Sequence, residues 1–175
     1  MKLNICLFFI SAVVLASCVD IPDYDNTPKI YYNGVDHYTE TDESTGQRKE
    51  TVIITIDFED GDGDLGASPA EISNPDFKAP YGSWGNYELV TARKNIDGTW
   101  SESILALDQE KWMPILKPDG KPGPIKGKLD LNTGGNPYTN STVPITFKFK
   151  VRIRDRALRV SNQIETDTVI LPGYR

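Results

Sequence analysis

The sequence predicts an all-β fold, specifically an immunoglobulin-like antiparallel β-sandwich of about seven strands. Three observations indicate it: apolar and polar residues alternate in several runs, turn-forming residues separate these runs, and helical periodicity is weak. Alternation with a period of two buries one face of a strand and exposes the other, as in antiparallel sheets. The length of 175 residues suits one domain, which we expect over residues 29–175.

The expected strands differ in how clearly the alternation marks them. The clearest covers residues 144–155, where Ile145 begins a row of alternate apolar side chains that ends at Ile153. Residues 51–58 alternate in the same way. Weaker alternation predicts strands over 29–32, 86–94, 99–105, 125–131 and 165–171.

The segments between the strands also carry local patterns. Asn95-Ile96-Asp97-Gly98 lies between two expected strands and predicts a hairpin turn. Residues 106–112 have the composition of a single helical turn. Residues 66–85 and 117–127 are rich in Pro, Gly and aromatic residues. Loops of this length usually carry function or are disordered.

The N-terminus has the layout of a secretory signal over residues 1–17, with Lys2, an apolar run and two small residues at its end. Cys18 follows directly, as it does in bacterial lipoprotein signals, where cleavage leaves a lipidated cysteine as the first residue. We expect residues 1–17 to be removed and Cys18 to be lipidated, which attaches the protein to a membrane through acyl chains. The alternative is an ordinary signal peptide with a chance cysteine.

Residues 18–28 combine the lipidated cysteine with a stretch rich in Asp and Pro, which predicts a flexible tether. Asp20, Asp23 and Asp25 fit either a signal for the outer face of the outer membrane or a solvated linker. We therefore expect an outer-membrane lipoprotein of the cell envelope, periplasmic or surface-exposed.

Composition limits the function classes further. The net charge is −6 and no basic stripe is present, which argues against a nucleic-acid partner. Because the sequence contains only Cys6, in the signal, and Cys18, no disulfide is expected and stability rests on the core or on a metal. A single histidine argues against most zinc and iron sites.

The strongest chemical motif follows the strand over 51–58. Asp60, Asp62 and Asp64 alternate with glycines, so their oxygens can point at one centre while the chain curls. Hard oxygen donors in a flexible loop suit calcium. The alternative is a structural turn, since Asp side chains bond nearby backbone N–H groups and glycine accepts positive φ.

The spacing of an EF-hand would add Glu71 as the twelfth position of this loop. Leu65 stands where an EF-hand requires glycine, and the flanking segments are not helical, so we expect a calcium site of another design. The expected ligands are Asp60, Asp62, Asp64 and Glu71, with Asp57 and Glu59 as further candidates.

Two segments together resemble small envelope lipoproteins of the Bacteroidota type: F-E-D-G-D-G-D-L-G over 58–66 and D-R-A-L-R-V-S-N-Q-I-E-T over 155–166. The resemblance implies a β-sandwich lipoprotein of largely unassigned role and brings no catalytic residues. In the late segment, Asp155 and Asn162 either cap backbone groups or approach the Asp-rich loop.

A second functional hypothesis rests on four aromatic residues, Tyr81, Trp84, Trp100 and Trp112, whose rings would stack on sugars if they were exposed. The alternative is ordinary packing. No convincing catalytic triad, cysteine nucleophile or phosphate-binding loop is found, so we expect no enzyme. The expected function is a lipid-anchored module that binds or displays an envelope protein or glycan. The alternative is a carbohydrate-binding accessory lipoprotein of an outer-membrane glycan uptake system.

Overall fold

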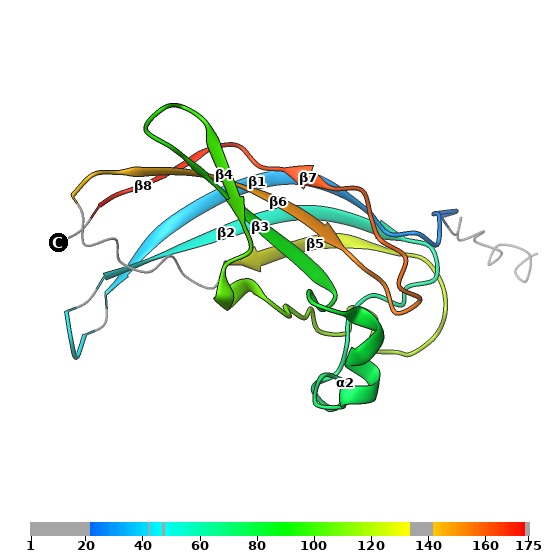
Figure 1. The fold of residues 1–175 in the computed structure, drawn as a ribbon. Helices are drawn as coiled ribbons and strands as arrows, with labels where there is room; N and C mark the ends of the chain where they lie inside the picture. Colours follow the sequence, from blue (N-terminus) through cyan, green and yellow to red (C-terminus); the bar gives the residue numbers. More distant parts are fainter. Residues whose placement is uncertain (1–21, 42, 47, 134–141, 174–175) are drawn as a thin grey trace, which may run out of the picture.

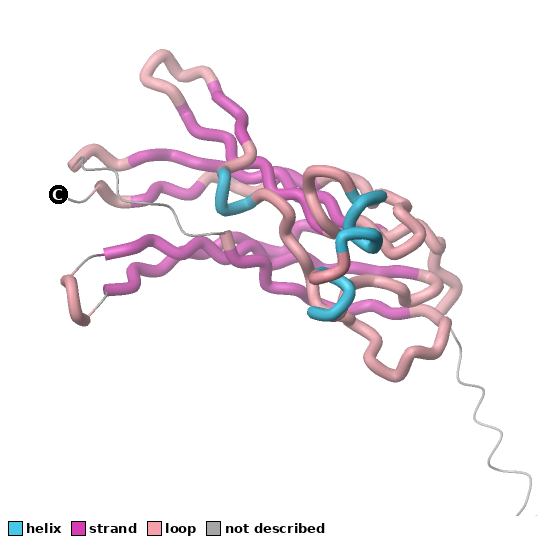
Figure 2. Tube along the Cα trace, turned by 60° about the horizontal axis from the view of Figure 1, so that its bottom comes forward, coloured by secondary structure: helices cyan, strands magenta, loops and turns pink. Residues whose placement is uncertain are grey.

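Two antiparallel sheets stacked face to face form the molecule (Figures 1 and 2). The computed structural model describes residues 22–41, 43–46, 48–133 and 142–173. The predicted signal over 1–17 and the predicted lipidation site Cys18 lie outside the described residues. The all-β prediction is confirmed.

Sheet A has three strands in the order β1-β2-β5, and sheet B follows the order β4-β3-β6-β7, with β8 also paired to β6. Sheet A consists of β1 (Lys29–Thr41), β2 (Arg48–Asp60) and β5 (Ile125–Asn132). Sheet B consists of β3 (Tyr87–Lys94), β4 (Trp100–Ser103), β6 (Ile145–Ile153), β7 (Ile164–Glu165) and β8 (Val169–Leu171). Placing the first, second and fifth strands on one sheet and the third, sixth and last on the other is the immunoglobulin-like arrangement.

The core lies between the sheets and follows the alternation seen in the sequence. On β2, Val52, Ile54 and Ile56 are fully buried, while their neighbours on the strand face outward. On β6, Phe149 and Val151 face them from the other sheet and are also fully buried. Each such side chain contributes roughly 1.5–3 kcal/mol when it is removed from water. The core therefore provides the main stabilisation of a domain that has no cysteine after residue 18.

The first strand is longer than predicted. The expected strand over 29–32 extends as β1 to Thr41, which pairs with Arg48 of β2. β5 reaches only as far as Ile53 on β2, so β1 and β2 continue beyond it as a two-stranded ribbon. Residues 36–41 are exposed, and backbone hydrogen bonds rather than apolar burial hold this part of β1. The sequence over 36–41 therefore lacks the alternation of apolar and polar residues that predicts a strand.

The loop over 66–85 contains three short helical turns that were not predicted: α2 (Pro69–Ile72), α3 (Pro75–Lys78) and η1 (Ala79–Tyr81). Ser68 caps α2 and Asn74 caps α3, each directly before a proline at the first helical position. The single turn expected within 106–112 is present as η2 (Ala106–Asp108). In the described part of the chain no helix is long and apolar enough to span a membrane.

The predicted hairpin turn between β3 and β4 is confirmed. The Gly98 N–H donates to the Asn95 carbonyl at 3.0 Å, and Gly98 has a φ of 86°, which favours glycine. The hairpin projects from the body of the sandwich, away from the N-terminal segment (Figures 1 and 2).

Candidate metal centre

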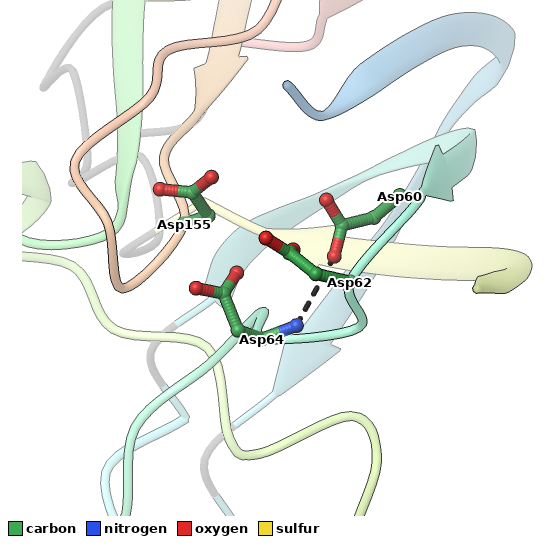
Figure 3. A group of neighbouring side chains, drawn as sticks. All are labelled: Asp60, Asp62, Asp64 and Asp155. Carbon is green, nitrogen blue, oxygen red and sulfur yellow. Dashed lines mark hydrogen bonds between the residues drawn. The ribbon is translucent and has the colours of Figure 1, made fainter. Parts of the chain in front are cut away.

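Four aspartates meet at the end of the sandwich where the N-terminal segment enters. Asp60 is the last residue of β2, Asp62 and Asp64 follow it, and Asp155 comes just after β6 of the other sheet. One carboxylate oxygen of each lies within 4.8 Å of the others. Figure 3 shows the four side chains facing a common centre. This group of four aspartates could hold a metal ion.

The glycines of the motif explain how the loop fits at this place. Gly63 has a φ of 71°, and a Cβ there would overlap the Gly123 carbonyl oxygen. A Cβ on Gly61 would overlap the Tyr24 carbonyl oxygen. Both positions therefore require glycine because neighbouring backbone approaches closely. The Asp64 N–H donates to Asp60 Oδ2 at 3.1 Å, so the loop also has the bonding of an Asp/Gly turn.

Three carboxylate oxygens of the group have no partner. Asp60 is 0% exposed, and the Oδ1 atoms of Asp60, Asp62 and Asp64 are buried without a hydrogen-bond donor among the described residues. A buried polar atom without a partner costs about 1–3 kcal/mol, and more when it is charged. A turn that served only its own backbone would not require three such oxygens. A cation between them would satisfy all three.

The electrostatics of the group also favour a bound cation. Burial, together with the nearby charges of Asp62 and Asp64, raises the pKa of Asp60 to about 7. Burial raises the pKa of Asp155 to about 6, and Asp64 adds to the effect. Burial and the Asp62 charge also raise the pKa of Asp64. Without an added cation the group resists full ionisation.

Arg159 supplies one positive charge to the group. Its Nη1 lies 2.7 Å from Asp62 Oδ2 and 3.2 Å from Asp155 Oδ2. One guanidinium balances four carboxylates only in part, so the cluster keeps an excess of negative charge when it is ionised. Attraction of a divalent cation follows from that excess.

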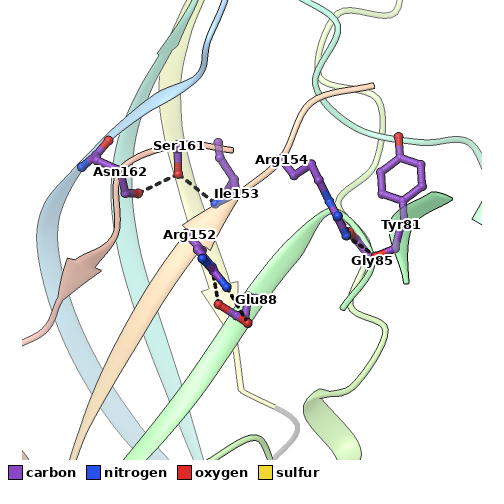
Figure 4. A network of polar contacts seen from close by, with 8 residues as sticks. All are labelled: Tyr81, Gly85, Glu88, Arg152, Ile153, Arg154, Ser161 and Asn162. Carbon is purple, nitrogen blue, oxygen red and sulfur yellow. Dashed lines mark hydrogen bonds and ion pairs between the residues drawn. The ribbon is translucent and has the colours of Figure 1, made fainter. Parts of the chain in front are cut away.

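Asp155 fulfils both roles that its sequence context left open. It caps the turn after β6, since its Oδ1 accepts the Arg159 N–H at 2.7 Å, and it also faces the Asp-rich loop. Asn162 acts only on the backbone in the described structure: its side chain accepts from the Ile30 N–H at 2.9 Å and donates to the Ile30 carbonyl at 2.8 Å. Figure 4 places Ser161 and Asn162 beside the end of β6.

The structure does not bring the other three proposed ligands to this centre. The Glu71 side chain accepts from the Ser68 backbone N–H at 2.8 Å and forms an ion pair with Arg156. Asp57 accepts from Asn33 at 2.7 Å, and Glu59 accepts from the Tyr31 hydroxyl at 2.7 Å. Positions 57 and 59 alternate with the inward-facing side chains of β2, so they point away from Asp60.

Asp25 and Asn26, which fall within the predicted tether, contact the domain. The Gly61 N–H donates to the Asp25 carbonyl at 2.9 Å, and Arg159 Nη1 donates to the Asn26 carbonyl at 2.7 Å. The last residues of the predicted tether are therefore bound to the domain, because the glycine at position 61 allows the backbone to lie against the loop.

The four aromatic residues do not form one platform. Tyr81 is buried, and its ring centroid lies 4.8 Å from that of the half-buried Trp112. The Arg154 guanidinium lies 3.9 Å from the Trp84 ring and 5.0 Å from the Tyr81 ring. Trp100 pairs with Lys94 at the other end of β3 and packs against Lys148. Sugar binding by these residues stays a prediction.

Arg154 fastens the loop over 66–85, which carries Tyr81 and Trp84, to sheet B. Its Nη2 donates to the Gly85 carbonyl at 2.7 Å and also to the Tyr81 carbonyl (Figure 4). On β6, Arg152 forms a two-point ion pair with Glu88 of β3. Arg154 therefore attaches the loop over 66–85 to sheet B.

Together the fold and the site define an immunoglobulin-like β-sandwich with a group of four aspartates suited to a metal ion. Comparisons of the chain with protein-family models, curated proteins and solved structures find no significant match.

Proposed function

We propose that this protein is a lipid-anchored lipoprotein of the cell envelope whose β-sandwich is a non-enzymatic binding module that holds a structural calcium ion. The ligands are Asp60, Asp62, Asp64 and Asp155. The observation that carries the proposal is the set of three buried, unpaired carboxylate oxygens that converge beside Asp155. The anchor is Cys18, proposed from the sequence.

Calcium suits this donor set better than other common cations. Calcium accepts oxygen ligands at 2.3–2.6 Å, so two oxygens on opposite sides of the ion stand roughly 5 Å apart. One carboxylate oxygen of each aspartate lies within 4.8 Å of the others, so a single ion of this size can reach all four. Magnesium usually keeps several waters and takes one or two carboxylates, and zinc prefers nitrogen and sulfur ligands. A group of carboxylates without histidine or cysteine therefore favours calcium.

The same assignment supports a non-enzymatic role. The acids that the described structure groups together are the proposed calcium ligands, so they are not free to act as an acid–base pair. The ion joins the loop after β2 to the turn after β6, which links the two sheets at one end.

Calcium binding to the native state tests the proposal directly. At a calcium concentration 100 times the Kd, binding adds about 2.7 kcal/mol to the free energy of unfolding. For a domain of this size the Tm rises by roughly 5–10 °C. Thermal melts in calcium and in chelator, with isothermal titration calorimetry, measure both effects.

Two variants make the test specific. Asp64→Asn removes a ligand charge, and we expect it to lose most of the calcium-dependent rise in Tm. Asp57→Asn is the matched control, since Asp57 lies on the outer face of β2 and contacts Asn33. An unchanged Tm and no heat of binding for the wild-type protein would contradict the proposal.

A further inference from the structure

The segment over residues 24–27 lies against both loops that carry the four aspartates. On one side, the Gly61 N–H donates to the Asp25 carbonyl at 2.9 Å, inside the Asp-rich loop. On the other side, Arg159 of the turn after β6 donates to the Asn26 carbonyl at 2.7 Å. Asp25 Oδ1 also accepts the Thr27 N–H at 2.7 Å, which gives the segment its turn. The segment is thus held by two elements from different sheets.

One atom connects this segment to the candidate metal centre. Arg159 Nη1, which binds the Asn26 carbonyl, also lies 2.7 Å from Asp62 Oδ2 and 3.2 Å from Asp155 Oδ2. Gly61 lies between the ligands Asp60 and Asp62. Both groups that hold residues 25 and 26 are therefore fixed by the positions of the proposed ligands.

Removal of a bound cation would disturb the contacts of Gly61 and Arg159 with residues 25 and 26. Without it, the buried carboxylates repel one another across the gap between the two loops. Separation of the loops would move Gly61 and Arg159 apart, and residues 24–27 bridge these two groups. A cation that holds the four carboxylates together keeps both contacts in place.

We propose that calcium at Asp60, Asp62, Asp64 and Asp155 clamps residues 24–27 onto the sandwich, so that the ion sets where the ordered domain begins along the chain from Cys18. Arg159 is the positioning residue of this clamp. The inference rests on the proposed calcium site and adds a regulated property to it: the length of free chain between the membrane anchor and the domain.

The order of residues 24–27 is the quantity to measure. We would record ¹⁵N NMR order parameters on the full lipidated protein in detergent, once with calcium and once with chelator. With calcium we expect values near 0.85 for residues 24–27, as in rigid backbone, and in chelator we expect values below about 0.6. Calorimetry on the same sample measures calcium binding independently.

The variant Arg159→Gln tests the ordering of residues 24–27 separately from calcium binding. The substitution removes a positive charge beside Asp62, so we expect calcium to bind at least as tightly as in the wild-type protein. It also removes the contact to Asn26, so we expect residues 24–27 to be mobile even when calcium is bound. Arg156→Gln is the matched control from the same turn, since Arg156 contacts Glu71 and Phe77. We expect this variant to keep both properties.

The outcomes distinguish the two proposals. If calcium binds and residues 24–27 are equally ordered in calcium and in chelator, the clamp is wrong and the calcium site stands. If Arg159→Gln keeps the calcium-dependent ordering, the role assigned to Arg159 is wrong. If calorimetry detects no calcium binding, the proposed function itself fails.

Discussion

Asp60 occupies a position that the alternation of β2 would otherwise give to an apolar residue. The inward-facing residues before it, from Val52 to Phe58, are all buried and apolar. A carboxylate at the end of this row is costly unless a cation or a hydrogen-bond donor meets it. Asp60 Oδ2 has such a donor in the Asp64 N–H, whereas Oδ1 has none among the described residues.

The raised pKa values predict how the calcium-free protein responds to pH. Asp60 has a pKa of about 7 and Asp155 of about 6 in the folded state, both above the ordinary value of 3.8. Between about pH 4 and pH 7 the folded state therefore binds more protons than the unfolded state, and stability falls as pH rises. The charged groups that face Asp60 and Asp155 are Asp62, Asp64 and Arg159.

Urea unfolding in chelator at pH 5 and pH 7 checks this prediction. We expect a lower midpoint at pH 7 in chelator, and a smaller difference or none when calcium is present. Equal midpoints at the two pH values in chelator would contradict it.

For single residues, the sequence predicted the aspartates that are neighbours in one loop, but not that Asp155, which is distant in the sequence, joins them. Asp60, Asp62 and Asp64 are close because they alternate with glycines in one loop. Asp155 joins them only through the packing of one sheet on the other, so its sequence context left its role open. Glu71 was proposed from a spacing, but Ser68, three residues before it, forms a capping box with it instead.

Among the elements, alternation marks a strand only when burial stabilises it. β6 was predicted nearly in full, and β2 over residues 51–58 of its range, because one face of each contributes to the core. The outer half of β1 has no such face and depends on hydrogen bonds to β2. The strand expected over 165–171 is divided into β7 and β8, since the Thr166 hydroxyl takes the place of a backbone carbonyl and accepts the Phe149 N–H at 3.0 Å.

The loop over 66–85 depends on Arg154 for its attachment to sheet B. Arg154→Ala would leave the carbonyls of Tyr81 and Gly85 without this donor and would expose the Trp84 ring. Hydrogen bonds to charged groups contribute about 1.5–3 kcal/mol, so we expect a loss of roughly 2–4 kcal/mol in the free energy of unfolding. We also expect a changed tryptophan signal in near-ultraviolet circular dichroism.

Arg156→Ala is the control for this substitution. Arg156 is partly exposed, and its contacts are an ion pair with Glu71 and the ring of Phe77, so we expect a loss of less than about 1 kcal/mol. Similar losses for the two variants would show that Arg154 has no special role in holding the loop.

As a whole molecule, the sandwich has one continuous core between its sheets, and the described residues contain no cysteine that could form a disulfide. Phe149 is fully buried at the centre of β6, and its truncation would leave a cavity facing β2. We expect Phe149→Ala to lower the free energy of unfolding by about 3–5 kcal/mol. Both sheets should still unfold in one transition, at a lower denaturant midpoint.

Denaturation followed by tryptophan fluorescence and by far-ultraviolet circular dichroism checks this prediction. The two signals should give coincident transitions in the wild-type protein and in Phe149→Ala. Tyr38→Ala, on the exposed part of the first hairpin, should change stability little. Separate transitions for the two signals would contradict a single core.

The projecting turn between β3 and β4 offers a place for a chemical reporter. Ile96 at this turn is fully exposed, and the chain has no cysteine after residue 18. With Cys18 lipidated and the signal removed, as we propose, Ile96→Cys would create a single accessible thiol, on a hairpin that extends away from the N-terminal segment. A maleimide that does not cross membranes would label this thiol on intact cells when the domain faces outward, and only after lysis when it faces inward.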